Sequence, residues 1–196
     1  MAFRHAILCL TTLFICLAND PKSASSQSPA LMEAYEIMKT RMQEGRYTEA
    51  EPLAKEALRL GKEEFGPNHY VTGQLLSNLG HVQMLQGRYA EAETLFQRSL
   101  SIHEEALGPE DLNVANSLDF LAELHRRQKH YSKAEPFYRR ALAIYEKALG
   151  PGNLDLSTKL ETLAEFFGEQ GRYAEAEPLL QRAVAIREND LGPEHP

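Results

Sequence analysis

One phrase recurs four times along this chain of 196 residues, at a constant spacing of 42 residues. Its aromatic residue is Tyr47, Tyr89, Tyr131 or Tyr173. A Gly-Arg pair precedes the aromatic in three copies, and Lys-His precedes it in the third. A sequence period of roughly 20–50 residues predicts stacked supersecondary units rather than one globule. Such units usually present a surface to a partner instead of forming a catalytic cleft.

The segments between these markers have the periodicity of helices. Leu76 and Leu79 in the second copy, like Leu160 and Leu163 in the fourth, lie three apart, as on one face of an amphipathic helix. A period of this length also suits a β-propeller blade or a HEAT-like helical unit. A blade needs four strands, whereas these segments are rich in Ala, Glu, Leu, Arg and Gln, and the chain has no Trp. The sequence therefore predicts two helices per copy.

Start and stop signals predict where these helices begin and end. Thr48 with Glu51, and Ser132 with Glu135, match a capping box at the start of the second helix. A proline stands in the first turn of this helix in three copies, where a missing N–H costs little. The glycine that stands two residues before the aromatic in three copies is typical of the residue that follows a helix. The signals predict four hairpins, near residues 29–65, 70–107, 112–149 and 154–191.

A small residue marks the point where the two helices of a copy should cross. The alanine three positions after each aromatic would face Gly80, Ala122 or Ala164 of the first helix. Small side chains at such a contact allow the two helix axes to approach closely. The alanines are Ala50, Ala92, Ala134 and Ala176.

Residues at these positions resemble the tetratricopeptide repeat. The resemblance rests on Leu79-Gly80 with Gly87–Glu93, and on Leu121–His125 with Ser132–Tyr138. The period, the Ala-Glu-Pro triplets and residues 191–196 resemble the kinesin light chain variety in particular. The resemblance implies an all-α fold, an α-solenoid of four helix-turn-helix repeats in a right-handed superhelix. The repeats would span about residues 29–69, 70–111, 112–153 and 154–196.

The first 18 residues differ from the rest of the chain. One positive charge is followed by an apolar run and then by small residues before a polar break, which is the pattern of a secretory signal peptide. The run is short for a membrane span of roughly 20 residues. We expect a signal peptide at residues 1–18, a linker at 19–28 and a repeat domain at 29–196, in an exported protein that is periplasmic or secreted. An uncleaved membrane anchor is the open alternative.

Charge and motifs narrow the chemistry. A net charge of −7 argues against binding to nucleic acid or to anionic lipid, because both need a basic surface. The sequence shows no phosphate loop, His-Glu-x-x-His, Cys pair or Gly-x-Ser-x-Gly. We therefore expect no catalytic residue, no cofactor and no metal site, and a chain that is not an enzyme. In place of the family's tyrosine late in the first helix stand Arg41, Gln83, His125 and Phe167, and we expect His125 to be a core histidine.

The resemblance also implies that the first helices line a concave groove. The first two would offer apolar side chains with nothing evident to cover them, and the last two an acidic face. Like charges four apart on a helix are destabilising by roughly 0.2–0.5 kcal/mol per pair, which a partner's cation could offset. A solvated acidic face is the open alternative. The expected groove residues are Tyr35, Met42, His81, Met84, Asp119, Glu123, Arg126, Arg127, Glu161, Glu165 and Glu169.

Two functions fit this sequence. The first is an exported interaction scaffold that binds a peptide or helix of a protein partner in the groove. The second is the N-terminal repeat domain of a longer signalling or hydrolytic protein, because Leu191–Pro196 would lead into a further first helix. In either case the last helix should keep an apolar face that no following helix covers.

Export should remove the signal peptide and leave Asn19 as the first residue of the mature chain. The basis is the short apolar run and the small residue Ala18 before the polar break. Intact-mass spectrometry of the exported protein should find a chain that begins at Asn19. Retention of Met1 would mean that the protein is anchored by this segment instead.

Overall fold

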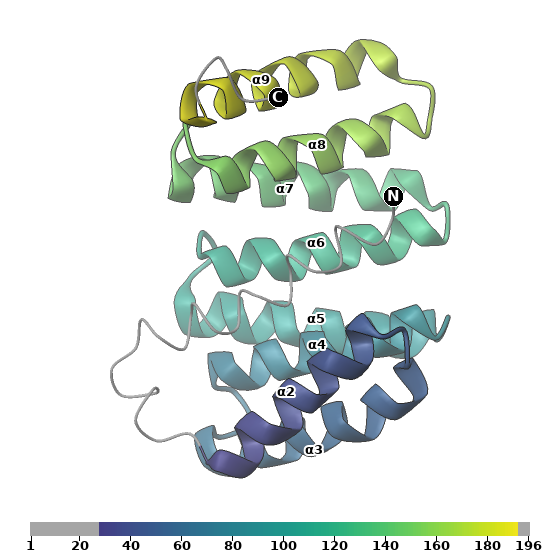
Figure 1. Ribbon diagram of the computed structural model, residues 1–196, viewed down its shortest axis with the longest axis vertical. Helices are drawn as coiled ribbons and strands as arrows, with labels where there is room; N and C mark the ends of the chain where they lie inside the picture. Colours follow the sequence, from purple (N-terminus) through teal and green to yellow (C-terminus); the bar gives the residue numbers. More distant parts are fainter. Residues whose placement is uncertain (1–27, 192–196) are drawn as a thin grey trace. The chain divides into compact units, whose positions relative to one another are not determined.

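The computed structural model describes residues 28–191, which form eight α-helices and, in that range, no β-strand. The helices follow one another as antiparallel hairpins (Figure 1). The predicted all-α class and all four hairpin ranges are confirmed. The predicted signal peptide and nearly all of the linker lie outside the described residues. The helices are α2 Pro29–Gln43, α3 Tyr47–Phe65, α4 Tyr70–Leu85, α5 Tyr89–Leu107, α6 Leu112–Arg127, α7 Tyr131–Leu149, α8 Leu154–Gly168 and α9 Tyr173–Leu191.

Contacts divide the chain after Gly108 into two compact units, each with two hairpins. Unit 1 contains α2 to α5, and unit 2 contains α6 to α9. Within each unit, the first helix of the later repeat packs on the second helix of the earlier one: α4 on α3, and α8 on α7. Between residues 28 and 191, no helix is both long and apolar enough to cross a bilayer. The right-handed superhelix stays a prediction of the resemblance.

The first helix of each hairpin begins at a side-chain cap. The capping residue has an extended backbone, and its side chain accepts a hydrogen bond from an N–H two or three residues further on. This bond satisfies one of the N–H groups that a helix start leaves without a partner. The caps are Ser28, His69, Asp111 and Asn153.

The second helix begins differently, and the predicted capping boxes are wrong. Helices α3 and α7 start at the tyrosine itself, so their N-cap residues are Arg46 and His130, neither of which makes a side-chain cap bond. Thr48 and Ser132 therefore lie inside the first turn, one residue past the start. The glutamates of the supposed boxes, Glu51 and Glu135, are bound by cations instead of by backbone N–H groups.

The turn inside each hairpin needs a left-handed residue. Gly45, Gly87 and Gly171 have φ values of 74°, 80° and 72°, a region in which glycine is unstrained. Lys129 takes this place in the third repeat with φ 59°, and it is the only non-glycine residue of the described part with a positive φ. The same backbone turn is thus kept where the sequence phrase departs from Gly-Arg.

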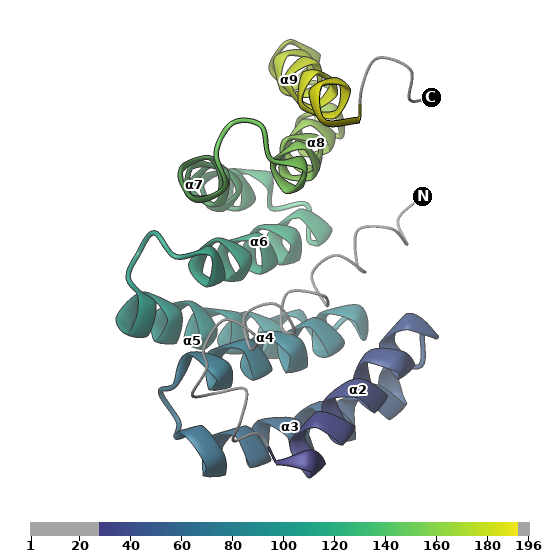
Figure 2. The ribbon, with the colours of Figure 1, turned by 60° about the vertical axis from the view of Figure 1, so that its left-hand side comes forward.

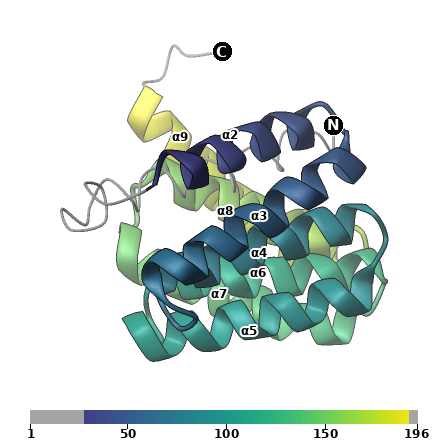
Figure 3. The same cartoon turned by 90° about the horizontal axis from the view of Figure 1, so that it is seen from below.

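The core of unit 1 consists of buried side chains from α2, α3 and α4, together with Ile102 of α5. Figure 2 and Figure 3 show the helices of this unit. Ala50 is fully buried in it, as the predicted close crossing requires. Helices α4 and α5 also approach closely, since a Cβ on Gly80 would lie 2.8 Å from the Phe96 ring. Leu75 of α4 approaches Gly61 of α3 so closely that a Cβ there would overlap with it. Small residues therefore set the spacing within and between the repeats of this unit.

Unit 2 uses aromatic residues at the contact between its repeats. Phe166 of α8 is fully buried, with its ring centroid 5.9 Å from that of Tyr131 and 5.1 Å from that of Tyr138 on α7. Ala122 of α6 and Ala134 of α7 are both fully buried in the same cluster. The predicted crossing of two small residues is therefore present in the third repeat.

Replacing Ala134 with leucine should destabilise unit 2 by about 1–3 kcal/mol, because the larger side chain would overpack a contact without free space. Ala143→Leu is the matched control, since Ala143 is exposed on the same helix and should change stability by roughly 0.5 kcal/mol or less. Urea unfolding followed by circular dichroism would compare the two. Equal stability of both variants would contradict the crossing at Ala134.

Candidate functional site

The apolar part of the predicted groove is a core rather than a surface. Tyr35 and Met42 of α2 retain 2% and 5% of their exposed area and belong to the buried cluster of unit 1. Burial, with a smaller effect of Glu36, raises the pKa of the Tyr35 phenol well above its usual value. The expectation that these side chains are uncovered is wrong, because they lie in one buried cluster with side chains of α3 and α4.

His81 and Met84 of α4 are buried as well, with 6% and 1% of their area exposed. Side chains with so little accessible surface cannot contact a partner unless the helix moves. We therefore remove Tyr35, Met42, His81 and Met84 from the candidate site. What is left of the prediction lies on α6 and α8 of unit 2.

Glu123 is the centre of the remaining site. Its carboxylate accepts hydrogen bonds from Arg126 Nε at 2.7 Å and from Arg127 Nε at 2.7 Å. The buried hydroxyl of Tyr138, on α7, donates to it at 3.2 Å. Burial by itself would raise the pKa of Glu123, but the hydrogen bond and charge of Arg126, followed by Arg127, outweigh it and lower that pKa. Glu123 is therefore held ionised in a fixed orientation.

Asp119, one turn earlier on α6, has a similar environment. The hydroxyl of Tyr145 on α7 lies 3.0 Å from Asp119 Oδ2 and 2.7 Å from Asn116 Oδ1, and these two acceptors share its one proton. Lys159 of α8 binds the Asp119 carboxylate at 2.7 Å, and its ammonium lies 4.4 Å from the centre of the Tyr145 ring. A cation over an aromatic face is attracted by the ring's quadrupole. Two buried tyrosines of α7 thus orient the two acids of α6.

The acidic residues of α8 are not a row of uncompensated charges. Glu161 is paired with Arg187 of α9, and Glu169 is paired with Arg126 of α6. The expected mutual repulsion is therefore offset by cations within this chain, which corrects the prediction. Glu165 is exposed, and no cation of the described residues is found on its carboxylate.

The structure thus brings seven of the eleven predicted residues together on one face, which we call the α6–α8 face. Pairs between the two helices, Lys159 with Asp119 and Arg126 with Glu169, hold it together. Sequence reasoning missed the residues that orient these charges, which are Tyr138, Tyr145 and Lys159. Only Tyr138 carried a recognisable signal, because it lies in a segment that resembles the family. The face consists of Asp119, Glu123, Arg126, Arg127, Lys159, Glu161, Glu165 and Glu169.

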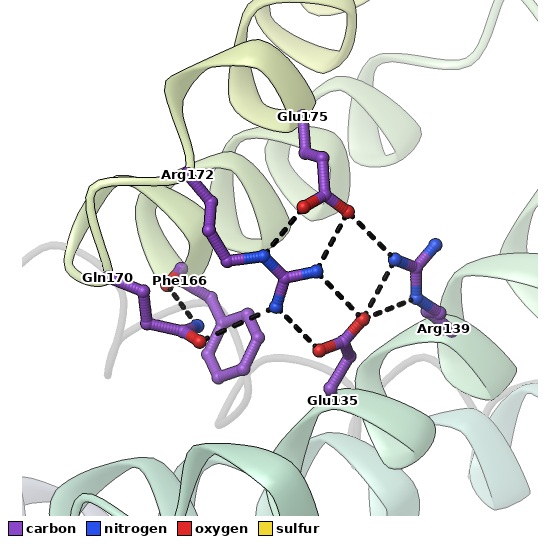
Figure 4. A network of polar contacts seen from close by, with 6 residues as sticks. All are labelled: Glu135, Arg139, Phe166, Gln170, Arg172 and Glu175. Atoms are coloured by element: carbon purple, nitrogen blue, oxygen red, sulfur yellow. Dashed lines mark hydrogen bonds and ion pairs between the residues drawn. The ribbon is translucent and has the colours of Figure 1, made fainter.

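A second polar network joins α7 to the turn before α9 (Figure 4). Arg172 binds Glu135 at 2.6 Å and Glu175 at 2.6 Å, and Arg139 binds both of these acids. Hydrogen bonds from Arg172, then from Arg139, lower the pKa of Glu135 to about 2 against a smaller opposing effect of burial. The network is formed by residues of the repeated phrase, so it links one repeat to the next.

Unit 1 contains the same link at the same repeat positions. Arg88 binds Glu51 at 2.7 Å and also pairs with Glu91. Hydrogen bonds from Lys55, then from Arg88, lower the pKa of Glu51 to about 2. The Gly-Arg pair of the phrase therefore supplies an arginine that reaches back to the second helix of the preceding repeat.

Neither network has the form of a catalytic centre. Within residues 28–191, no group of three or more His, Cys, Asp or Glu side chains could hold a metal ion. The buried Ser99 donates to the Gly73 carbonyl at 2.7 Å, and His103 lies 3.1 Å from the Tyr70 carbonyl, so this pair serves the packing of α4 on α5. His125 is buried and stacked on Phe137, which confirms it as a core histidine. The α6–α8 face presents charged side chains in a fixed arrangement.

Comparison with known proteins identifies the repeats. Two models described as tetratricopeptide repeat match the chain, one over residues 71–147 and the other over residues 42–70 and 158–196. No curated protein matches the sequence. Among solved structures, BtubC (BKLC) from P. vanneervenii has a TM-score of 0.71 and 21% identity, over 100% of this chain and 76% of that one.

Two further structures are similar. The nearly identical TPR-like repeats of a kinesin light chain candidate from Podosopora anserina have a TM-score of 0.73 and 23% identity, over 87% of this chain and 81% of that one. MamA has a TM-score of 0.57 and 15% identity, over 96% of this chain and 91% of that one. At such identities the likeness shows the fold and does not transfer a function.

Replacing Glu135 with glutamine should destabilise unit 2 by about 1 kcal/mol at neutral pH, since the ion pairs are partly exposed. Glu135 has a lowered pKa in the folded state, so its contribution is present above the unfolded pKa of about 4.3 and is lost as the pH falls towards 2. The difference between variant and wild type should therefore shrink below about pH 4.5. Urea unfolding at several pH values would measure it.

Glu177→Gln is the matched control for this prediction. Glu177 holds the same repeat position on α9, but its carboxylate accepts a hydrogen bond from Gln181 at 3.2 Å and has no arginine among the described residues. Its replacement should change stability by roughly 0.5 kcal/mol or less, at any pH. Equal effects at the two positions would show that the arginine contributes nothing.

Proposed function

Because this chain belongs to the tetratricopeptide repeat family, whose fold implies a protein–protein interaction scaffold, we propose that it is a non-enzymatic scaffold that binds a peptide on the α6–α8 face. The single observation that supports this place is the fixed orientation of its charged groups. The buried hydroxyls of Tyr138 and Tyr145 on α7 form hydrogen bonds to Glu123 and Asp119. Groups that are ordered before binding lose less entropy when a partner arrives.

The charges of this face favour a peptide with a basic residue. Arg126, Lys159 and Arg187 are already engaged by acids of the chain, whereas Glu165 is exposed and has no such partner within residues 28–191. A lysine or arginine of the peptide would find its counter-ion at Glu165. The flanking Asp119 and Glu123 would then fix the register through directed hydrogen bonds to the peptide.

Export is the second part of the proposal. Residues 1–18 have the charged, apolar and small-residue segments of a signal peptide, and residues 19–28 have the polar composition of a linker. An exported scaffold would meet its partner in the periplasm or outside the cell. The pattern of the first residues supports this location, and the α6–α8 face would function equally in either place.

Selection of a random peptide library on the full chain tests the binding proposal. Enriched peptides should contain a basic residue, and Glu165→Gln should weaken their binding by about twofold to fivefold, as for a partly exposed ion pair. The effect should diminish at high salt, because attraction between exposed charges is screened over about 8 Å at physiological ionic strength. Isothermal titration at two salt concentrations would give both quantities.

Glu56→Gln is the control, since Glu56 is an exposed glutamate of α3 in unit 1 and lies outside the α6–α8 face. Its replacement should leave peptide binding unchanged. The triple variant of Glu161, Glu165 and Glu169 is less informative, because it also removes the pairs with Arg187 and Arg126. Peptides that bind wild type and Glu165→Gln equally would remove the α6–α8 face from consideration.

A further inference from the structure

The outward face of α9 carries an exposed apolar stripe. Tyr173, Leu180 and Val184 retain 71%, 45% and 52% of their surface. Together with Glu177 and Glu188 they follow one another at intervals of three or four residues, so they share one side of the helix. The opposite side of α9 packs on α8, where Ala176, Ala183 and Ile186 are buried. These five residues, Tyr173, Glu177, Leu180, Val184 and Glu188, form what we call the α9 outer face.

The same repeat positions are covered wherever a first helix follows in the same unit. Leu180 corresponds to Tyr138 on α7, which is 4% exposed, and to Ala54 on α3, which is 1% exposed. On α7 the cover is α8, whose Phe166 contacts Tyr138. On α3 the cover is α4, whose Leu75 closely approaches Gly61. Two examples within this chain therefore show that the first helix of a repeat fits on this face of a second helix.

A charge completes the pattern. At the position of Glu177, Glu135 is bound by Arg172 at 2.6 Å and Glu51 by Arg88 at 2.7 Å. In both cases the arginine stands in the turn that ends the covering helix. Glu177 is the equivalent glutamate at the same place on α9. Among the described residues, however, only Gln181 donates a hydrogen bond to it. The α9 outer face thus has the acceptor for an arginine that the described part of the chain does not supply.

We propose that the α9 outer face docks an amphipathic helix of a partner protein, which ends in a turn that carries an arginine. The helix lies on Leu180 and Val184 as α8 lies on α7, with an apolar side chain at the place of Phe166. Its arginine binds Glu177 as Arg172 binds Glu135. This site is separate from the α6–α8 face and does not depend on the function proposed for that face.

A second copy of this chain fits the α9 outer face poorly. The first helix that such a copy could offer is α2, whose exposed positions include Glu33, Ile37 and Thr40. Glu44, which follows α2, stands where Gln86 and Gln170 stand after the helices α4 and α8 that do cover a neighbour. It would bring a carboxylate close to Glu177, and like charges at such a contact are repulsive. The occupant is therefore a helix other than α2 of a second copy.

The chain itself supplies the probe for a test. A synthetic peptide with the sequence of residues 154–172 contains the helix and the arginine that cover α7. Labelled with a fluorophore, it should bind the full chain saturably in an anisotropy titration. A peptide with the sequence of residues 29–46 is the matched control, since it has Arg46 but also Glu33 and Glu44, and it should bind at least about tenfold more weakly.

Variants of the chain locate the binding. The double variant Leu180→Gln and Val184→Gln should weaken binding roughly tenfold, because two apolar contacts are lost. Both side chains are exposed, so the variant should remain folded. Ile37→Gln is the control, since Ile37 is an exposed apolar residue of α2 and is 38% exposed. It should leave the affinity unchanged.

The arginine contact has its own test. Glu177→Gln should weaken the 154–172 peptide about twofold to fivefold. Glu177→Gln should not change the affinity for the same peptide with Arg172→Ala. The losses of affinity caused by the two changes should therefore not be additive. Additive losses would show that the arginine does not reach Glu177 and would overturn the assigned register.

Three other results would overturn the docking proposal. They are no saturable binding up to about 1 mM peptide, equal weakening by Ile37→Gln and by the α9 variants, and concentration-dependent dimerisation that Leu180→Gln abolishes. The last would assign the face to a second copy. Binding of basic peptides to the α6–α8 face should be unaffected by the α9 variants, so failure of one proposal leaves the other testable.

Discussion

Each second helix in this structure has two sides to bury, and its own hairpin covers only one of them. On α7, α6 covers the side with Ala134, and α8 covers the side with Tyr138. The hydrophobic gain from the second side is available only when another helix follows, which makes stability a property of neighbouring repeats rather than of one hairpin. Hydrophobic packing is not directional, and Arg172, in the turn after α8, adds a directional ion pair with Glu135 of α7.

What could be predicted of the fold from the sequence is what local signals determine, and contacts between repeats determine the rest. A period of 42 residues, with glycines at the turns, predicted all four hairpin ranges, because each stop signal acts on the local backbone alone. The capping boxes failed for a related reason. Thr48 and Glu51 have the correct spacing, but the helix already starts at Tyr47, and Glu51 gains more from Arg88 and Lys55 than from a backbone N–H. Contacts between repeats determine the partner of Glu51, and the spacing of residues along the sequence does not reveal such contacts.

The candidate site was predictable only in part, for the same physical reason. Met42 and Tyr35 were expected at the surface because the resemblance assigns their positions to the concave side, which does not say what packs against them in this chain. The charged residues of α6 and α8 were expected on a common face, and the pairs of Lys159 with Asp119 and of Arg126 with Glu169 link the two helices. Their pairing was not foreseen. Lys159 and Asp119 are 40 residues apart in sequence, and only the stacking of α8 on α7 brings them within 2.7 Å.

The position late in each first helix shows how freely a repeat can vary around this constraint. Arg41 pairs there with Glu44, Gln83 lies 3.5 Å from Glu91, and the guanidinium of Arg172 lies 4.4 Å from the Phe167 ring. Ion pair, amide contact and cation–π contact replace one another at this position beside the hairpin turn, although Gln83 and Phe167 are both buried. In the third repeat His125 stacks on Phe137 instead.

That third repeat also has His130 and Lys133 where the others have an arginine and a glutamate, so its turn lacks the pair found at Arg46–Glu49, Arg88–Glu91 and Arg172–Glu175. His125 of this repeat is buried and stacked on Phe137. The repeat keeps its backbone, with Lys129 left-handed in the place of glycine. What the fold requires is a turn of this shape and a covered second helix, and the side chains around the turn are free to differ and to give each repeat a surface of its own.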